Sequence, residues 1–384
     1  MTNQSTAPAI MQPQLKQRLL SLDFFRGLTM AAMVLVNNPG DWGHIYAPLE
    51  HSKWNGCTPT DLIFPFFLFM VGVSIVYAIS GRKGDKTQHK PIILKALKRS
   101  VTLYIIFALL ALIPNFDFAH FRILGVLPRI AIVFFICVII FIKTNFKTWL
   151  WLFSIILIVY CFLMTVIPVP GYGYAILERG ENLAAWLDNI ILTPKHVWNQ
   201  TKTWDPEGVL STLPAIATCL YGMMVGATLK RADLKESEKV AWLLTFATFS
   251  IMIALIWNNW FPINKSLWTS TFVLYTGGLA TAGLTISYWL IDVHHRRKYI
   301  TPFIAYGSNA ITAYVAADTV LIILGLIHVN LHGHTTNLQD YLYQTIFVPN
   351  FSPINASLAG AITYVVILSI PMMILYKKKI FIKV

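Results

Sequence analysis

The stretch of this sequence with the clearest chemical potential is a histidine followed by a dense block of polar residues. The block reads HSKWNGCTPTDLIFPF from His51, and it places Asp61 ten residues after the imidazole. An imidazole titrates near neutral pH and can act as a general base or as an acyl acceptor. Asp61 can orient that imidazole, or it can cap the following helix, because Thr58 to Asp61 has the composition of a helix N-cap. Both interpretations of Asp61 stay open.

Two ionisable residues and an asparagine interrupt the apolar stretch 20–37. Asp23 precedes Arg26 by three residues, close enough to pair on a helix, and Asn37 follows Arg26 by eleven. At 100° per residue, Arg26 and Asn37 lie within about 20° of each other, roughly 16 Å apart along the axis. The stretch therefore predicts a helix with polar groups at both ends of one face. The alternative is an Asp–Arg pair that orients the helix, with Asn37 as its C-cap.

A second pair of arginines lies in FRILGVLPRIA. Arg122 and Arg129 are seven residues apart and share a helix face, although Pro128 disturbs the helix locally. Arg122 can extend to a membrane interface, the common position for such a side chain. Arg129 lies deeper and requires a partner, either an anionic ligand group or a carboxylate of another helix.

The composition places these groups in a polytopic membrane protein. Of the 384 residues, 56% are hydrophobic and only 12% are charged. Soluble domains carry about 25% charged residues, so the composition excludes a soluble enzyme and a disordered chain. A formal charge of +13 would suit a nucleic-acid binder, but the Lys and Arg residues cluster between apolar runs, as in cytoplasmic loops. No nucleic-acid partner is expected.

Apolar runs of about 17–25 residues are long enough to cross a bilayer. The fold class predicted is an all-α membrane helix bundle of about ten spans, or eleven, because the third run is short and residues 338–348 resemble an interfacial helix. The ten runs are 20–37, 61–80, 99–114, 123–142, 148–168, 209–229, 240–260, 267–291, 302–327 and 356–376.

Alternating these spans from a cytoplasmic N-terminus places 22 Lys and Arg residues inside and six outside. This asymmetry predicts both termini in the cytoplasm. We expect residues 1–18 to form a cytoplasmic tail with no signal peptide, and 19–384 to form a single transmembrane domain. The outer loops are 38–60, 169–208 and 328–355.

Other kinds of site lack support in the sequence. His328, His332 and His334 are crowded in one outer loop, but their spacing is irregular and Asp340 is the only acid nearby, so no metal site is expected. Three of the four cysteines lie inside apolar segments. No nucleophile elbow and no Walker or dinucleotide glycine pattern precedes a helix.

Five blocks of the sequence, in order from about residue 19 to 320, resemble the transmembrane heparan-α-glucosaminide N-acetyltransferase family. They are SLDFFRG…MVLVNN, HSKWNGCTPTDLIFPFFLFMVG, FRILGVLPRIA, DPEGVLSTLPAIATCLYGMMVG from Asp205 and PINKSLWTSTFVLYTGG from Pro262. The second block is highly specific. The resemblance implies acetyl transfer from cytoplasmic acetyl-CoA to an amino sugar across the membrane. It implies His51 as the catalytic histidine and Asn37 as the essential asparagine.

The resemblance also suggests roles for the remaining polar residues. Asp23, Arg26, Arg122 and Arg129 are expected at the acetyl-CoA site, with Arg26 on the CoA phosphates. An extended pantetheine arm is comparable in length to the separation of Arg26 and Asn37. The acceptor sugar is expected to contact Trp54, Asn55, Asp205, Glu207, Asn264 and Lys265. Asp205 and Glu207 can equally precede Val209 as N-terminal caps.

The chain departs from the family pattern in three places. No counterpart of the N-terminal lumenal domain of the lysosomal enzyme is expected, the loop from Asn37 to His51 is longer, and Gly307-Ser308-Asn309 keeps only part of a motif. These differences bear on the identity of the acceptor sugar more than on the chemistry. A bacterial inner-membrane protein of this form, with its site open to the periplasm, would act on periplasmic amino sugars or glycans.

Two other functions fit the same features. An amino-sugar permease would also carry intramembrane Arg and Asn, but the two halves of the chain do not match as repeats, which argues against it. O-acetylation of a cell-envelope glycan would use the same scaffold with a hydroxyl acceptor. Membrane lipid is an expected partner, and a homodimer is a possible oligomeric state.

Overall fold

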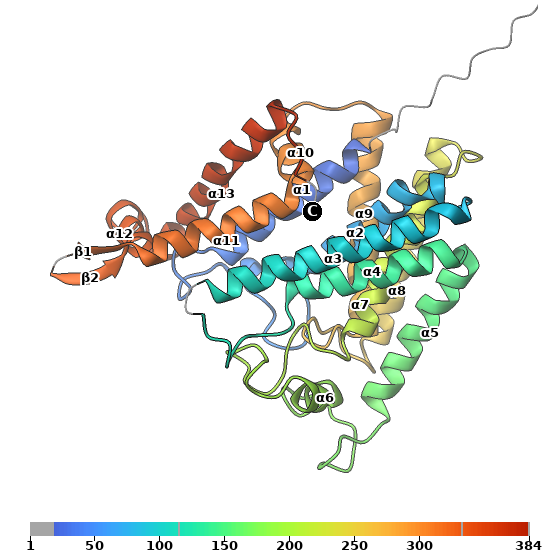
Figure 1. The fold of residues 1–384 in the computed structure, drawn as a ribbon, viewed down its shortest axis with the longest axis horizontal. Helices are drawn as coiled ribbons and strands as arrows, with labels where there is room; N and C mark the ends of the chain where they lie inside the picture. The colour runs from blue at the N-terminus through green and yellow to red at the C-terminus, as the bar shows by residue number, and fades with distance from the viewer. Residues whose placement is uncertain (1–18, 114–115, 332, 383–384) are drawn as a thin grey trace, which may run out of the picture.

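The computed structural model describes residues 19–113, 116–331 and 333–382 as a helical membrane-protein bundle (Figure 1). The predicted tail 1–18 lies outside the described residues. The long helices are α1 (Leu20–Asn37), α2 (Ile63–Ile79), α3 (His89–Leu112), α4 (Val126–Lys143), α5 (Phe146–Thr165), α7 (Thr212–Leu229), α8 (Glu236–Trp257), α9 (Ser270–Tyr288), α11 (Ala310–Leu326) and α13 (Pro353–Lys377).

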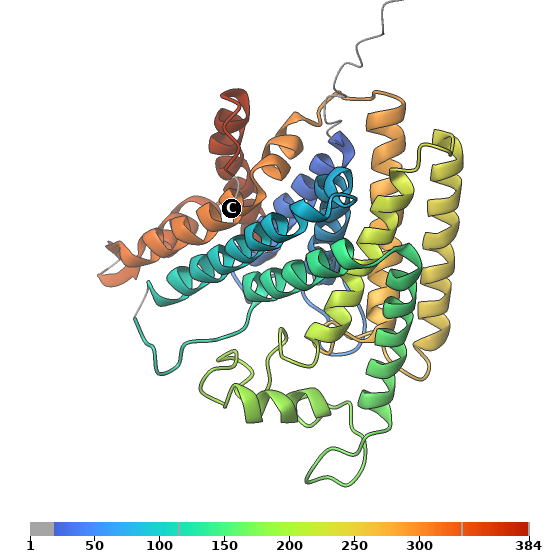
Figure 2. The same cartoon turned by 45° about the vertical axis from the view of Figure 1, so that its right-hand side comes forward.

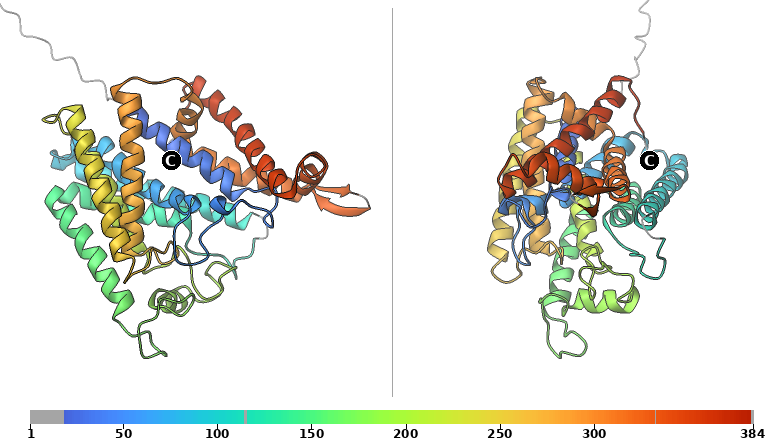
Figure 3. Two further views of the ribbon diagram at one scale, coloured as in Figure 1. Left: turned by 180° about the vertical axis from the view of Figure 1, so that it is seen from behind. Right: turned by 90° about the vertical axis from the view of Figure 1, so that its left-hand side faces the viewer.

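Shorter elements connect these helices. Three are α-helices: α6 (Leu183–Ile191), α10 (Thr301–Ser308) and α12 (Leu338–Leu342). The remaining turns of helix are η1 (Ala47–Leu49), η2 (Pro59–Leu62), η3 (Ser80–Arg82), η4 (Lys86–Gln88), η5 (Trp289–Val293) and η6 (Tyr343–Phe347). In the described part of the chain, the strands are β1 (His328–Leu331) and β2 (His334–Asn337), an antiparallel hairpin. The hairpin projects from the side of the molecule at the end of α11 (Figures 1 and 3).

Each of the ten predicted spans overlaps a helix, but two differ in form. The range 99–114 belongs to α3, which begins at His89 and therefore includes basic residues that the prediction assigned to a loop. The range 302–327 is two helices, α10 and α11, that meet at an angle of 86°. Among the described residues, seven helices are long and apolar enough to cross a membrane, or eight if the bent pair is one span. The exact number of spans stays a prediction.

The centre of the bundle is the contact between α2 and α7, which glycines make very close. A Cβ atom at Gly72 would lie 2.0 Å from the carbonyl oxygen of Cys219, and one at Gly222 would lie 1.9 Å from that of Phe69. Neither distance is sterically possible, so only glycine lets the two backbones approach in this way. Because η2 leads directly into α2, this packing also fixes the end of the predicted His51–Asp61 block, where Asp61 lies.

Peripheral helices expose apolar side chains, as a lipid-facing surface requires. On α5, Trp151, Ile155, Ile158 and Phe162 are all exposed, and α8 exposes Phe249, Ile253 and Ile256 in the same way. Exposed apolar area of this extent on a water-facing surface would be an association liability. Together with the length of the helices, it identifies an integral membrane protein.

The bend between α10 and α11 is held by bonds from two distant segments. Asn309, at the bend, is buried; its amide donates to the Ile380 carbonyl oxygen at 3.1 Å, and its carbonyl oxygen accepts from the Ile382 N–H at 2.9 Å. Arg26 donates to the carbonyl oxygen of Gly307 at 3.3 Å. A helix that ends inside a membrane leaves carbonyl groups without helical partners. The bond from Arg26 satisfies one of these carbonyls, while the Asn309 side chain joins the bend to the C-terminal segment.

Three of the connecting segments lie at opposite ends of the bundle. In Figure 2 the turn between α7 and α8 and the connection from α9 to α10 lie at the top, while α6 and its flanking loops lie at the bottom. The first two segments are among those predicted to be cytoplasmic, and α6 belongs to the predicted outer loop 169–208. The grouping agrees with the predicted alternation; which end faces the cytoplasm stays a prediction.

Accessibility labelling tests that orientation. With the four native cysteines replaced by Ser or Ala, Lys53→Cys and Thr87→Cys should react with a membrane-impermeant maleimide from opposite sides of sealed membranes, because they flank α2. Lys53→Cys should react in intact cells and Thr87→Cys only after the membrane is opened. Reaction of both from one side would overturn the membrane map.

Candidate active site

The predicted pair of His51 and Asp61 is formed. His51 Nδ1 lies 2.7 Å from Asp61 Oδ1. Asp61 Oδ2 accepts the N–H of Ser52 at 3.0 Å, the N–H of Thr58 at 3.0 Å and the Thr58 hydroxyl at 3.1 Å. The Asp61 side chain is 1% exposed, while that of His51 is 52% exposed. The carboxylate therefore does both things that the sequence left open: it caps η2 and it orients the imidazole.

A lysine from the turn between α8 and α9 completes this group. Lys265 Nζ lies 3.5 Å from Asp61 Oδ1, 3.0 Å from His51 Nδ1 and 3.4 Å from His51 Nε2. Burial lowers the pKa of Lys265, and the negative charges of Asp61 and Glu207 oppose that change. We call His51, Asp61 and Lys265 the imidazole triad; it joins residues 214 positions apart around one exposed ring.

Two asparagines fix the turn that carries Lys265. Asn264 is fully buried, and its side chain donates to Asn55 Oδ1 at 3.1 Å while accepting the Leu267 N–H at 2.9 Å. Beside them, the Gly56 N–H donates to the Ile263 carbonyl oxygen at 2.7 Å. The predicted sugar-binding residues Asn55 and Asn264 are thus bonded to each other, and they hold the two loops of the triad together. Their contact with a sugar stays a prediction.

Trp54 joins the same loop to the predicted outer loop 169–208. Its indole N–H donates to the Leu177 carbonyl oxygen at 3.1 Å, and its ring meets the Trp204 ring edge-on at 5.4 Å. The guanidinium of Arg179 lies 5.3 Å from the centre of the Trp54 ring. These contacts hold the loop that carries the triad against loop 169–208.

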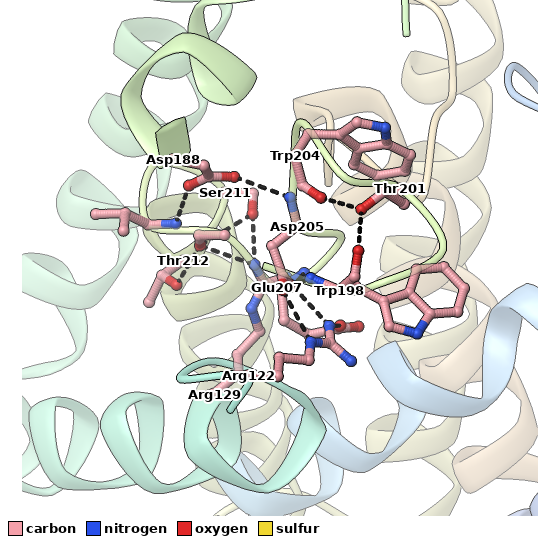
Figure 4. Close-up of polar contacts among 12 residues, drawn as sticks. Arg122, Arg129, Asp188, Trp198, Thr201, Trp204, Asp205, Glu207, Ser211 and Thr212 are labelled. Atoms are coloured by element: carbon pink, nitrogen blue, oxygen red, sulfur yellow. Dashed lines mark hydrogen bonds and ion pairs between the residues drawn. The ribbon is translucent and has the colours of Figure 1, made fainter. Parts of the chain in front are cut away.

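A second polar cluster surrounds Arg122 (Figure 4). Its guanidinium binds Asp205 in a bidentate manner, at 2.8 and 2.5 Å, and contacts Glu207 Oε2 at 2.5 Å. The Trp198 N–H donates to Asp205 at 3.0 Å. Asp205 and Glu207 therefore pair with an arginine that the sequence analysis assigned to the donor site. Asp205 also accepts the Glu207 N–H at 2.9 Å, as a cap would, but α7 begins only at Thr212 and its N-cap residue is Ser211.

Arg129 is fully buried beside this cluster and is only partly satisfied. Its Nη2 donates to the Gly208 carbonyl oxygen at 3.0 Å and to the Ser211 hydroxyl, and the Trp268 ring centre lies 5.2 Å from its Cζ. Within the described residues, its Nε and Nη1 atoms have no hydrogen-bond partner. Buried donors are normally paired, so these two nitrogens, which carry three N–H groups, remain open to a ligand or to water.

Sequence reasoning missed Asp188, which organises the loop between α6 and α7. Its carboxylate accepts the Val209 N–H at 2.8 Å and the Asp205 N–H at 3.2 Å (Figure 4). Burial raises the pKa of Asp188 to about 6. An acid within LAAWLDNII carries no periodic or motif signal, and its partners lie 17 and 21 residues away. Asp318, within the apolar range 302–327, was also missed, although its place inside a span is itself a signal.

The predicted site residues on α1, which are Asp23, Arg26 and Asn37, are described separately from the imidazole triad. Arg26 donates to Asp23 at 3.2 Å, to the Ser74 hydroxyl at 2.8 Å and to the Gly307 carbonyl oxygen. Asn37 is the exposed last residue of α1, and in the described chain its side chain makes no hydrogen bond. The predicted Asp23–Arg26 pair is therefore formed, and Asn37 has an amide free for other groups.

Cys57 lies in the same loop as the triad. Burial and the charge of Asp61 raise the pKa of its thiol to about 12. The thiolate, which is the reactive form, is therefore scarce near neutral pH. Over the described residues no group of three His, Cys, Asp or Glu side chains is placed to hold a metal ion; His332, one of the three crowded histidines, lies outside them.

The raised pKa of Asp188 gives a pH-dependent stability. Because the folded state binds this proton more tightly than the unfolded chain, the contribution of Asp188 to the free energy of unfolding is full below pH 3.8 and is lost as pH rises through about 6. Thermal unfolding in detergent, followed by tryptophan fluorescence, should show a larger loss of stability between pH 5 and pH 7 for the natural chain than for Asp188→Asn. Equal losses would show that Asp188 does not titrate in this way.

Comparison with known proteins supports the resemblance seen in the sequence. Residues 18–257 match the family model described as heparan-alpha-glucosaminide N-acetyltransferase, catalytic. The chain is 27% identical to the heparan-alpha-glucosaminide N-acetyltransferase of Mus musculus over 359 residues, which cover 79% of this chain and 54% of the mouse protein. It is 25% identical to the Homo sapiens protein of the same name over 358 residues, covering 79% and 53%. The chain spans about half the length of these curated relatives.

The matched region includes most of the site. Asn37, His51 and Asp61 fall inside residues 18–257, as do Arg122 and Arg129. Lys265, the third member of the imidazole triad, lies beyond that region and is identified by its contacts.

Proposed function

The chain belongs to the heparan-α-glucosaminide N-acetyltransferase catalytic family, and we propose that it transfers an acetyl group from acetyl-CoA to the amine of an amino sugar. The observation that carries this proposal is the imidazole triad. A half-exposed histidine is oriented by a buried carboxylate and has an ammonium group at its edge. This arrangement suits the removal of a proton from an incoming nucleophile.

The reaction uses His51 as a general base. With the Nδ1 hydrogen donated to Asp61, the lone pair of Nε2 is available. The acceptor amine attacks the thioester carbonyl carbon, Nε2 takes the amine proton, the C–S bond breaks, and the CoA thiolate leaves and is protonated to the thiol. The products are an N-acetyl sugar and CoA. A two-step route, in which Nε2 first accepts the acetyl group, uses the same atoms.

Negative charge develops on the thioester oxygen during this reaction. The free amide of Asn37 supplies a hydrogen-bond donor for that oxygen, a role that is worth about 10²–10³ in rate in other enzymes. Lys265 brings a positive charge to the same region, because its ammonium lies 3.4 Å from the nitrogen that acts as the base. The Asn37 amide and the Lys265 ammonium stabilise the negative charge that develops in the transition state, so their effect is on kcat.

In this proposal the donor binds between Arg26 and the pair formed by Arg122 and Arg129. Arg26 and Asp23 lie early in α1, where the CoA phosphates would enter from the cytoplasm, and the pantetheine arm runs toward Asn37. The open Nε and Nη1 donors of Arg129 and the guanidinium of Arg122 are suited to polar groups of the bound donor. In this assignment the acetyl group alone reaches the outer end of the bundle.

The acceptor binds at the loops around the triad. Trp54 offers an aromatic surface, and Asn55, Asn264 and Lys265 offer polar groups beside His51. Asp205 and Glu207 place two carboxylates in the same region, where they favour a cationic amino sugar, although Arg122 neutralises part of their charge. The protein would thus work in a bacterial inner membrane with its acceptor on the periplasmic side.

Acetyl transfer by the purified chain tests the function. With radiolabelled acetyl-CoA in detergent, glucosamine derivatives should yield an N-acetyl product, and His51→Ala should reduce kcat by at least 10³-fold with acetyl-CoA binding retained. A sugar that has hydroxyl groups but no amine is the control acceptor. If only the sugar without an amine gave an acetylated product, the result would indicate O-acetylation. No product, no CoA hydrolysis and no CoA binding would favour a permease.

The charge of Lys265 is tested by two substitutions. Lys265→Met should lower kcat about 10²-fold because it removes the cation beside the reacting atoms, and Lys265→Arg should restore part of that rate. Steady-state kinetics with the sugar as the varied substrate make the distinction. If Lys265→Met instead raised KM for the sugar and left kcat unchanged, Lys265 would bind the acceptor and take no part in the chemistry.

The phosphate role of Arg26 can be separated from its structural bonds. Arg26→Gln can still donate to Ser74 or Gly307 but has no charge, so it should bind CoA at least tenfold more weakly by isothermal titration. Arg26→Lys, which keeps the charge, is the matched variant and should bind CoA more tightly than Arg26→Gln. Equal CoA affinity of the natural chain and both variants would assign Arg26 to helix packing alone.

A further inference from the structure

A basic groove lies between the beginning of α3 and the end of α4, away from the imidazole triad. It has a volume of about 700 Å³, which is within the range of ligand sites in proteins. Its lining combines four basic residues with three aliphatic ones: Lys86, His89, Lys90, Lys143, Ile93, Leu94 and Ile142. The two helices lie side by side (Figures 1 and 2).

The positive charge of this groove is only partly balanced by the protein. Among the described residues, Lys86, Lys90 and Lys143 form no ion pair, and no acid lines the groove. The acid nearest in sequence, Asp85, is bonded to the N–H and the hydroxyl of Thr87 at 2.9 and 2.6 Å. Lys86 and Lys90 also stand at the N-terminal end of the 24-residue helix α3, where the helix dipole adds positive charge.

The aliphatic side of the groove continues down the helix. Leu94 is followed on the same face of α3 by Leu97, Val101 and Ile105, and each of these four side chains is between 43% and 54% exposed. Spacings of three and four residues keep them on one stripe. An apolar chain of a ligand bound at the lysines can therefore lie along this stripe of α3, which is expected to face lipid.

From these features we propose that the groove binds the headgroup of an anionic phospholipid, with its phosphate on Lys86, Lys90 and Lys143 and an acyl chain along the stripe of α3. Basic pockets between membrane helices on the cytoplasmic side recognise such headgroups, and the distribution of Lys and Arg predicts the cytoplasmic side for this end of α3. A soluble phosphate would use the lysines but leave the apolar stripe uncovered. The site is independent of the proposed acetyl transfer.

Lipid binding to the delipidated full chain tests the proposal. In native mass spectrometry, dioleoyl phosphatidylglycerol should bind the natural chain at least tenfold more tightly than it binds Lys86→Gln/Lys90→Gln/Lys143→Gln. Dioleoyl phosphatidylcholine, which has no net charge, should bind both chains equally weakly. The matched control is Lys377→Gln/Lys378→Gln/Lys379→Gln, which removes three lysines from the C-terminal end and should keep the affinity of the natural chain.

Three results would overturn the proposal. The groove variant could bind phosphatidylglycerol like the natural chain, or the C-terminal variant could lose as much affinity, which would indicate attraction by net charge alone. The third is equal affinity for glycerophosphoglycerol, the deacylated headgroup, which would identify a site for soluble phosphates. All these lysines are exposed, so the variants should unfold at the temperature of the natural chain, which is measured alongside.

Discussion

The candidate site depends on the interactions that the Asp61 carboxylate makes with its neighbours. This carboxylate is almost completely buried, and it binds the Ser52 and Thr58 backbone, the Thr58 hydroxyl and His51 while facing Lys265. A buried carboxylate is unfavourable unless such partners surround it. Each partner lies on a segment that is irregular by itself, and the requirement to satisfy one charge brings them to a common point. The imidazole is left exposed at the edge of that arrangement, which is where a substrate can reach it.

The helix bundle provides the rigidity that this loop group lacks. Glycines at the crossing of α2 and α7 bring two backbones into contact, and the block that contains Asp61 leads directly into α2. The turn that carries Lys265 leads into α9, which packs against both α7 and α8. The triad therefore lies at the ends of helices that cannot slide relative to one another without backbone clashes. Asn55 and Asn264 then set the finer position of the two loops.

Local features of the sequence predicted much of this arrangement. Contacts between residues far apart in the sequence were not predicted. Apolar runs identified the helices. The short spacing of His51 and Asp61 allowed their pairing, because ten residues of loop can return to their own start, but it left a helix cap as an equal alternative. The pairing of Lys265 with His51 depends on a fold that joins positions 214 residues apart, so spacing carries no information about it. The bend at Asn309 was missed for a similar reason: its bonds go to the C-terminal segment, while the local hydropathy is continuous.

The central claim is that Asp61 holds His51 in the form that acts as a base. It is tested most directly by Asp61→Asn, measured by rapid-quench single-turnover transfer from acetyl-CoA to glucosamine and compared with the natural chain. Asparagine has nearly the same shape but no charge, so the account predicts a transfer rate at least 10²-fold lower, with the dissociation constant for acetyl-CoA changed less than twofold. A transfer rate equal to that of the natural chain would contradict the account, because His51 would then need no carboxylate.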